Sequence, residues 1–488
     1  MHHATIWGRV RGVKQPTTLG DPVPHRYRVL VIVSVATFVA SLDLFIVNIA
    51  FPSIQRDFAG TSDATLSWVL SGYAIVTAAL LVPAGRLADL AGRKRLFIAG
   101  LVIFVLASAL CAAAPGAGWL IAARVLQAAG GAILMPASLA LLLAEFPPRD
   151  RALAVAVWSA TGAIAAAAGP PVGGLLVQAS WRWVFLVNLP VGLVTVVLAA
   201  RMLTESRAPD ARRLPDLVSA GLIILASSAL MLAIVQSQSW GWASVRIVGL
   251  LAGSVVLTLA FIYRSTRHAA PVLELGLFRS RAFSAANIAS VLFFGAFGAM
   301  LLANVLFLTR VWHEDILLAG LQISPGPIAA AAFAVPGSIL AGRSSPRAIA
   351  AAGALLFASG GAWWLTHISL QAHYVTDFLP GMLLGGAGVG FVIPTLATAV
   401  AGSLPRARFA TGSAVYGMTR QFGIALGVAV LIAVLSSAAK TGALASFRNG
   451  WEVMMAASIA SAIAAITIGR IKSEPAIPIA VPEVELAG

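Results

Sequence analysis

Long apolar stretches follow one another along almost the whole chain, and short polar or basic segments separate them. A helix that crosses the hydrocarbon layer of a membrane needs about 20 mostly apolar residues. The pattern therefore predicts an all-α polytopic membrane protein with fourteen spans. The predicted spans are 29–51, 65–85, 96–114, 119–142, 152–178, 184–203, 217–236, 245–263, 283–309, 316–340, 347–366, 378–400, 409–435 and 452–470.

Composition agrees with this pattern and argues against a soluble domain, a disulfide-stabilised fold and a metalloprotein. Hydrophobic residues make up 59% of the chain and charged residues 10%, whereas about a quarter of a soluble domain is charged. The single cysteine, Cys111, cannot form a disulfide within the chain. The seven histidines are scattered and show no metal-binding spacing. We therefore expect no metal site and no cofactor.

The basic residues predict how the chain is oriented. The net charge is +15, and 25 of the 33 Lys and Arg residues lie in the N-terminal segment, the C-terminal segment or the loops after even-numbered spans. The positive-inside rule then places both termini, residues 1–28 and 471–488, in the cytoplasm of a plasma-membrane protein. The charge is explained by topology and by contact with anionic membrane lipids, and we expect no nucleic-acid partner.

The two halves of the chain resemble each other. "VPAGRLADLAGRKR" at 82–95 matches "VPGSILAGRSSPR" at 335–347, and "GGAILMPASLALLLAEFPPRDRA" at 130–152 matches "GVGFVIPTLATAVAGSLPRARFA" at 388–410. Parallel six-helix repeats are a transporter architecture, with the substrate site at their interface. We predict six-helix bundles at 29–203 and 283–470, joined by a 204–282 linker that carries two additional helices.

One polar loop carries a recognisable motif. "GRLADLAGRKR" at 85–95 resembles the G-x-L-a-D-r-x-G-r-k loop of the major facilitator superfamily, with Leu90 in place of a usual basic residue. The resemblance implies that Gly85, Asp89, Gly92 and Arg93 form a cytoplasmic latch, with Asp89 against the start of span 13 near Arg408. The alternative is a turn with a cluster of orienting charges.

Three further stretches extend the resemblance over residues 28–470. "RVLQAAGGA" at 124–132 is similar to the R-x-x-Q-G-x-G motif, although Ala128 replaces a glycine. "GPPVGG" at 169–174 is similar to the G-P-x-x-G-G antiporter motif, and "LDLFIVNIAFP" at 42–52 resembles span 1 of the 14-helix drug:proton antiporters. Gly169, Pro170, Gly173 and Gly174 then form either ordinary small-residue packing or a pliable interface that seals one face during export.

Two charged residues lie deep in predicted spans of the first bundle. Asp43 is about 12 Å of helix from the outer end of span 1, and Arg124 is about 7–8 Å inside span 4. A charge inside the membrane is costly and usually functional. We expect Asp43 and Arg124 to face one central cavity and to be coupled, directly or through Gln127. The alternatives are proton coupling, a structural ion pair, and a carboxylate wetted by the outer vestibule.

The second bundle carries Arg420 near the middle of span 13, with no acid at a matching depth. Its expected partners are backbone carbonyls, Asn304, Gln421 or bound substrate, and its role is structural or gating. Asn48 is a further candidate for the cavity.

The resemblance implies a secondary exporter of lipophilic, often cationic drugs, driven by the proton gradient. A dedicated exporter of one metabolite or lipid is the second interpretation. An integral-membrane enzyme would need a reactive constellation that the sequence does not show, and ATP-driven transport would need a nucleotide motif that is absent. The repeat argues against a passive channel. A monomer is favoured.

Overall fold

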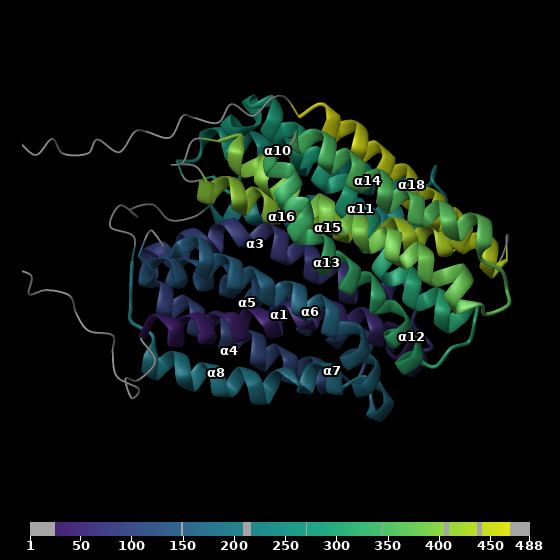
Figure 1. The fold of residues 1–488 in the computed structure, drawn as a ribbon, viewed down its shortest axis with the longest axis horizontal. Coiled ribbons are helices and arrows are strands. Elements are labelled where there is room, and N and C mark those ends of the chain that lie inside the picture. Colours follow the sequence, from purple (N-terminus) through teal and green to yellow (C-terminus); the bar gives the residue numbers. More distant parts are fainter. Residues whose placement is uncertain are drawn as a thin grey trace, which may run out of the picture.

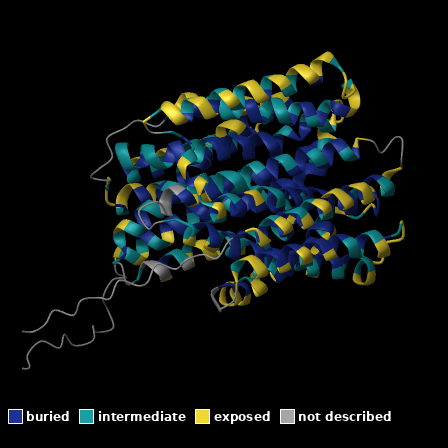
Figure 2. Ribbon diagram, turned by 90° about the horizontal axis from the view of Figure 1, so that it is seen from above, coloured by how far each residue is buried: buried dark blue, intermediate teal, exposed yellow. Residues whose placement is uncertain are grey.

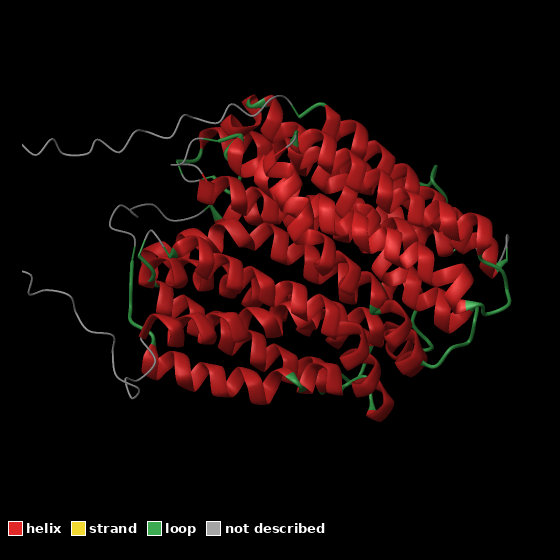
Figure 3. Ribbon diagram, viewed as in Figure 1, coloured by secondary structure: helices red, strands yellow, loops and turns green. Residues whose placement is uncertain are grey.

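The computed structural model describes residues 25–147, 150–207, 216–269, 271–343, 345–404, 409–436 and 442–468. Within these ranges every regular element is a helix (Figure 3). Fourteen helical segments of the described chain are long and apolar enough to cross a membrane. The predicted number of spans is therefore confirmed.

The helices fall into two groups of six spans and an inserted pair. The N-terminal bundle contains α1 (His25–Asp57), α2 (Asp63–Leu66), α3 (Trp68–Ala91), α4 (Arg93–Ala112), α5 (Ala117–Glu145), α6 (Arg151–Ala179), α7 (Trp183–Leu186) and α8 (Asn188–Met202). The inserted pair is α9 (Leu217–Trp240) and α10 (Val245–Arg267). The C-terminal bundle contains η1 (Leu275–Arg279), α11 (Arg281–Arg310), α12 (Ile316–Ile323), α13 (Pro325–Arg343), α14 (Pro346–His367), η2 (Tyr374–Phe378), α15 (Leu379–Gly402), α16 (Phe409–Leu435) and α18 (Ala443–Ile466).

Helix ends differ most from the prediction at the last span. The prediction of a start at residue 452 is wrong, because α18 begins at Ala443. Arg448 resembles a loop residue in the sequence, but it donates a hydrogen bond to the Ile368 carbonyl at 3.2 Å, and Glu452, the first residue of the predicted span, is exposed. Long polar side chains at the end of a span can reach out of the apolar layer without ending the helix.

The two bundles lie side by side, and α3 runs along their boundary (Figure 1). Contacts between them are made by α3 with α16, by α6 with α12 and α13, and by α1 with α11. Buried residues gather at the centre of the molecule, and exposed residues lie on its outer helices (Figure 2). We call the end of the molecule at the α3–α4 connection (Gly92) the basic end, and the end at the α1–α2 connection (residues 58–62) the far end.

The inserted pair covers one of the two seams between the bundles. Helix α9 packs against α10, α3 and α16. Val82 of α3 forms an apolar cluster with Ala220 of α9, Phe261 of α10 and Val272. The seam between α3 and α16 is therefore shielded by α9 and α10 in its basic half.

A buried carboxylate ties the inserted helices together. Asp216 caps α9 by accepting hydrogen bonds from the backbone N–H of Ser219 at 3.1 Å and from its hydroxyl at 2.6 Å. Its two oxygens also accept from Arg264 Nε on α10, at 2.9 and 3.0 Å. Burial raises the pKa of Asp216, but these hydrogen bonds outweigh burial and hold the pKa below its usual value.

This lowered pKa predicts a pH-dependent contribution to stability. A carboxyl group whose pKa is lowered on folding stabilises the protein above its unfolded-state pKa, and the stabilisation is lost as pH falls through the folded-state pKa. We expect Asp216→Asn to lower the free energy of unfolding by about 1 kcal/mol at neutral pH, as loss of a helix cap does. Thermal unfolding in detergent should show the difference from wild type shrinking below about pH 4. Glu452→Gln, which removes an exposed carboxylate, is the control and should show no such loss.

Candidate functional site

Asp43, Arg124 and Gln127 meet inside the N-terminal bundle. Arg124 Nη1 lies 2.5 Å from Asp43 Oδ2 and 2.6 Å from Gln127 Oε1. Gln127 Nε2 donates to Asp43 Oδ1 at 2.9 Å. The side chains of Asp43 and Arg124 are 0% and 1% exposed. The expected coupling is thus present in the geometry, as a direct ion pair joined by Gln127.

Two further polar side chains complete this arrangement, and the sequence did not point to them. Asn188, the first residue of α8, donates to Asp43 Oδ1 at 3.1 Å. Ser108 of α4 accepts from Gln127 at 2.8 Å and from Asn188 at 3.3 Å. We call Asp43, Ser108, Arg124, Gln127 and Asn188 the buried polar cluster. Four spans of one bundle contribute to it.

Arg124 has partners on every side. Its Nε donates to the Val69 carbonyl at 3.2 Å, and its guanidinium lies 4.2 Å from the centre of the Tyr73 ring. A buried ion pair is stable only when the remaining polar atoms are also satisfied. Here Asp43 accepts three hydrogen bonds, so the cluster can keep both charges out of water.

A small cavity lies beside the cluster, between the two bundles. Its lining residues come from both halves of the chain: Leu44, Asn48, Leu70, Arg124, Gly298, Leu301, Ile424 and Val428. It has room for about one water molecule, with about 10 Å³ open to the centre of a water-sized sphere. Asn48 therefore lies where the sequence predicted. Asp43 does not: the expectation that it faces the cavity is wrong, because it is fully buried in the N-terminal bundle and only its partner Arg124 reaches the lining.

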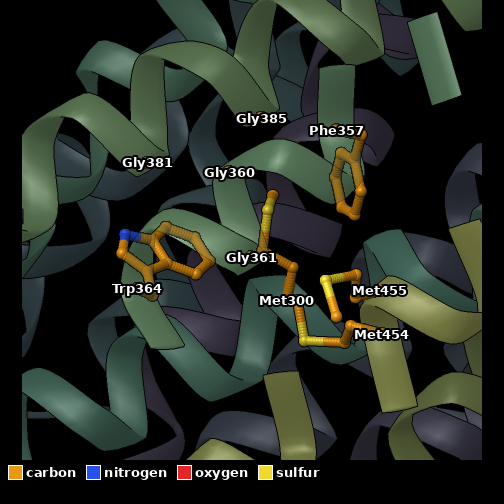
Figure 4. Close-up of a pocket in the computed structure, with 9 residues that line it drawn as sticks. All are labelled: Met300, Phe357, Gly360, Gly361, Trp364, Gly381, Gly385, Met454 and Met455. Carbon is orange, nitrogen blue, oxygen red and sulfur yellow. The ribbon is translucent and has the colours of Figure 1, made fainter. Parts of the chain in front are cut away.

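The C-terminal bundle has an apolar counterpart of the buried polar cluster. A narrow void, too small to hold a water molecule, lies among α11, α14, α15 and α18, with Met300, Met454 and Met455 pointing into it beside Phe357 and Trp364 (Figure 4). The repeat pairs these four helices with α1, α4, α5 and α8, which hold the cluster. The two bundles therefore share an architecture. Charged side chains lie at this position in the N-terminal bundle, and apolar side chains lie at the equivalent position in the C-terminal bundle.

Asn304 and Arg420 do not meet. Asn304 Nδ2 lies 3.0 Å from the sulfur of Met382. Arg420 instead places its guanidinium 4.7 Å from the centre of the Phe294 ring and 5.8 Å from that of Tyr416. The expectation of Asn304 as a partner of Arg420 is therefore wrong, because the Asn304 amide turns to Met382 on α15 and Arg420 turns to Phe294 and Tyr416.

The glycines of the 169–174 motif allow close helix contacts. A Cβ on Gly169 would lie 2.5 Å from Phe45 Cβ, and one on Gly173 would lie 3.2 Å from the backbone of Ile46. Both glycines face α1. A Cβ on Gly174 would lie 2.9 Å from Leu317 Cα on α12. The motif thus packs α6 both within its bundle and against the second bundle.

The far end is closed by two contacts between the bundles. Gly320 of α12 packs against the carbonyl of Pro170 on α6. Arg310 Nη2 pairs with Asp63 Oδ2 at 2.8 Å, and Asp63 also accepts from Gln55. Among the described residues this is the one ion pair that joins α11 to the N-terminal bundle.

The 85–95 loop is held by a residue that sequence reasoning missed. Gly92 has φ +119°, a conformation that strongly favours glycine. The Glu205 carboxylate sits against it and accepts hydrogen bonds from the backbone N–H groups of Lys94 and Arg95, at 3.1 and 3.2 Å. Glu205 therefore caps the N-terminus of α4, where a negative charge is favoured.

Asp89 pairs with Arg93, one helical turn away, at 2.8 Å. Arg408, near the expected partner of Asp89, lies outside the described residues. Gly85 lies close to α5, since a Cβ there would lie 3.4 Å from Pro136. The geometry of the loop thus connects α3, α4 and α5, and the latch stays a prediction.

Comparison with known proteins agrees with this geometry. The sequence model of the Major Facilitator Superfamily matches residues 33–428. Multidrug resistance protein Stp of Mycobacterium tuberculosis is 35% identical over 413 residues, which cover 84% of this chain and 75% of Stp. Puromycin resistance protein pur8 of Streptomyces alboniger is 34% identical over 459 residues, 92% of this chain and 88% of pur8.

Solved structures show the same fold at much lower identity. A D-xylose-proton symporter superimposes with a TM-score of 0.67 at 13% identity, covering 92% of this chain and 99% of the symporter. An inward-facing bacterial homolog of the human lysosomal transporter Spinster gives 0.66 at 16% identity, covering 93% and 100%.

Proposed function

The chain belongs to the major facilitator superfamily, and from this we propose that it is a secondary exporter that moves lipophilic drugs or toxic compounds out of the cell in exchange for protons. The observation that carries the proposal is the buried Asp43–Arg124 ion pair beside a cavity that both bundles line. A titratable group sealed in the membrane beside the interface of the two bundles, where transporters of this architecture bind substrate, is suited to couple proton and substrate movement.

The cluster suggests how coupling works. Asp43 is out of reach of a molecule in the cavity, so proton and substrate do not compete for its carboxylate directly. Protonation of Asp43 would instead remove the charge that holds Arg124. The guanidinium, held less tightly, would then lean into the cavity that it already lines and lower the affinity for the substrate. Deprotonation would restore the ion pair and the affinity. Proton and substrate would therefore each weaken the binding of the other, which is the basis of antiport.

We assign the basic end to the cytoplasm, from the distribution of Lys and Arg along the sequence. The far end then faces outward, and the Gly320–Pro170 and Asp63–Arg310 contacts close it in this structure. Opening to the outside would separate α6 from α12 and break the Asp63–Arg310 pair. The 85–95 loop would latch the cytoplasmic side in that outward-open state. We expect one chain to suffice, since both bundles that line the cavity belong to it.

The names of similar proteins support two kinds of exporter, one for many drugs and one for a single compound. Stp is named a multidrug resistance protein, whereas a relative of 30% identity is named a tetracenomycin C resistance and export protein. A broad range of drugs is our first proposal, and a dedicated exporter of one compound is the second. The test is transport by the purified protein in proteoliposomes, with a panel of lipophilic compounds and an imposed pH gradient. Transport of several compounds that follows the gradient supports the proposal, and transport of none that depends on the gradient contradicts it.

Closure of the far end gives a second prediction. Gly174→Leu should hold α6 away from α12, because even a Cβ at this position would lie 2.9 Å from Leu317 Cα. We expect transport to fall at least tenfold. A cysteine introduced at Asn48 in the cavity should become more accessible to an impermeant maleimide from the far end. The one native cysteine, Cys111, is buried and gives little background.

The matched control is Gly253→Leu on α10, where no atom lies within 4 Å of the position that a Cβ would take. It adds the same side chain to a membrane helix and should leave transport and labelling unchanged. If Gly174→Leu transported normally with Asn48→Cys still protected, the α6–α12 contact would not be the outer seal.

A further inference from the structure

We infer that Arg420 binds the negatively charged group of the substrate, so that the substrates of this exporter include lipophilic and aromatic organic acids. The inference rests on the proposed export function and narrows its substrate class. It departs from the cationic compounds that the family resemblance suggests.

Arg420 is the membrane-embedded charge that the rest of the fold does not use. Among the described residues, its guanidinium makes no hydrogen bond and no ion pair, and its buried Nε atom has no partner. Arg124, the other arginine in the bundle interior, contacts a carboxylate, an amide oxygen and a backbone carbonyl. A guanidinium has five N–H groups, and leaving such donors unsatisfied inside a membrane protein is unfavourable. A ligand with acceptor oxygens would satisfy them.

The position of Arg420 places it next to the cavity. Ile424, one helical turn along α16, lines that cavity, and so does Val428. On the other flank of the same helix face, Gly423 packs against Phe294 of α11. Gly417 faces Leu81 of α3 in the other bundle. Arg420 therefore lies on the face of α16 between the residues that line the cavity and those that contact α11 and α3. This places it at the seam between the bundles, one helical turn nearer the basic end than the cavity.

The charges around the cavity favour an anion. Asp43 is the one buried carboxylate inside a described span, and it is already paired with Arg124. The Asp43–Arg124 pair has no net charge, so the positive charge of Arg420 beside the cavity is not compensated. Like charges repel strongly where the dielectric constant is low. A cationic molecule would meet Arg420 with no free carboxylate to bind, whereas an anionic molecule would neutralise it.

The neighbours of Arg420 favour an aromatic acid over a small inorganic anion. Phe294 and Tyr416 lie beside its guanidinium, and the cavity lining is otherwise mostly apolar, with Leu44, Leu70 and Leu301. A guanidinium binds carboxylates with two parallel hydrogen bonds and stacks on aromatic rings. The ligand that matches carries a carboxylate or phenolate on a flat apolar body. The methionine-lined void of Figure 4 has no charged side chain and could not make this distinction.

The test compares three probes of one shape: naphthoate, its neutral methyl ester, and the naphthylmethylammonium cation. Equilibrium binding is measured at neutral pH with the full-length protein in lipid nanodiscs, and binding to empty nanodiscs is subtracted. Wild type should bind naphthoate about tenfold or more tightly than the ester, as expected for a hydrogen bond to a charged group. Equal affinity for acid and ester, or a preference for the cation, would overturn the inference without needing any variant.

Arg420→Gln should reduce the affinity for naphthoate at least tenfold and leave that for the ester unchanged. Arg420→Lys should retain part of the preference, because it keeps the charge but loses the planar fork. The control is Arg246→Gln, which removes an arginine stacked 5.4 Å from the Trp240 ring in the inserted pair, far from the cavity lining. An equal loss of affinity for all three probes in Arg420→Gln would show a structural role and overturn the inference.

Gradient-driven transport by the same purified protein in proteoliposomes separates this inference from the proposed function. If wild type shows gradient-driven transport but no preference for the acid, the proposed exporter function is supported and the anion site is contradicted. A preference for the acid without gradient-driven transport of any compound would leave the site and contradict the proton antiporter.

Discussion

Asp43→Asn is expected to abolish proton-driven transport while the protein stays folded and still binds substrate, at lower affinity. Asparagine has nearly the shape of aspartate, so its side-chain oxygen can still accept from Arg124, which keeps the Val69 carbonyl, Gln127 and the Tyr73 ring as further partners. It cannot take up or release a proton. Uptake into proteoliposomes against a substrate gradient should therefore fall to the level of empty vesicles, whereas exchange of labelled for unlabelled substrate should persist.

The matched control for this variant is Asp57→Asn at the far end, which removes a partly exposed carboxylate from the same helix. It should retain proton-driven uptake. Full pH-driven uptake by Asp43→Asn would show that the Asp43–Arg124 pair is structural and that another group carries the proton.

Arg124→Gln is expected to destabilise the protein far more than the loss of both charges together. With arginine removed, the Asp43 carboxylate keeps only the amide donors of Gln127 and Asn188 in a fully buried site. Removing one partner of a buried ion pair typically costs about 3–5 kcal/mol, because the other charge stays buried and unpaired. The double variant Asp43→Asn/Arg124→Gln carries neither charge, so thermal unfolding in detergent should show it more stable than Arg124→Gln alone.

The comparison pair is Arg182 and Asp57, which lie 2.9 Å apart at the far end with side chains 38% and 46% exposed. Exposed ion pairs contribute at most about 1 kcal/mol. Their double-variant cycle should therefore give a much smaller coupling energy. Equal coupling in the two cycles would contradict the view that burial makes the Asp43–Arg124 pair critical.

The spans were predictable because each depends on a property of a continuous stretch of sequence. Length and hydropathy identify a membrane helix without knowledge of its neighbours. The ends were less predictable. Arg448 resembles a loop residue, but α18 already begins at Ala443. The helix tolerates Arg448 because its long side chain reaches the backbone carbonyl of Ile368. The breaks at Ser67 and Val187, which divide spans 2 and 6 into two helices, also left no clear signal.

The site was only partly predictable, because charge is conspicuous in an apolar sequence and contact between helices is not. Asp43 and Arg124 could be matched by depth alone. Ser108 and Asn188 are uncharged residues of ordinary frequency in such helices, and only packing brings them to Asp43. Glu205 lies 110 residues from Arg95, whose N–H it accepts, so no local spacing could connect them. The depth of Asp43 in its span also did not show that Arg124 separates it from the cavity.

The most direct test of the account follows protons and substrate in the same vesicles. Proteoliposomes that contain a pH-sensitive dye are loaded with a compound that the wild type transports, and lumenal pH and substrate are recorded together. Wild type should move protons in the direction opposite to substrate and at a fixed ratio to it, and Asp43→Asn should exchange substrate with no linked pH change. Substrate movement by wild type without proton movement, or an unchanged proton signal in Asp43→Asn, would contradict proton antiport through Asp43.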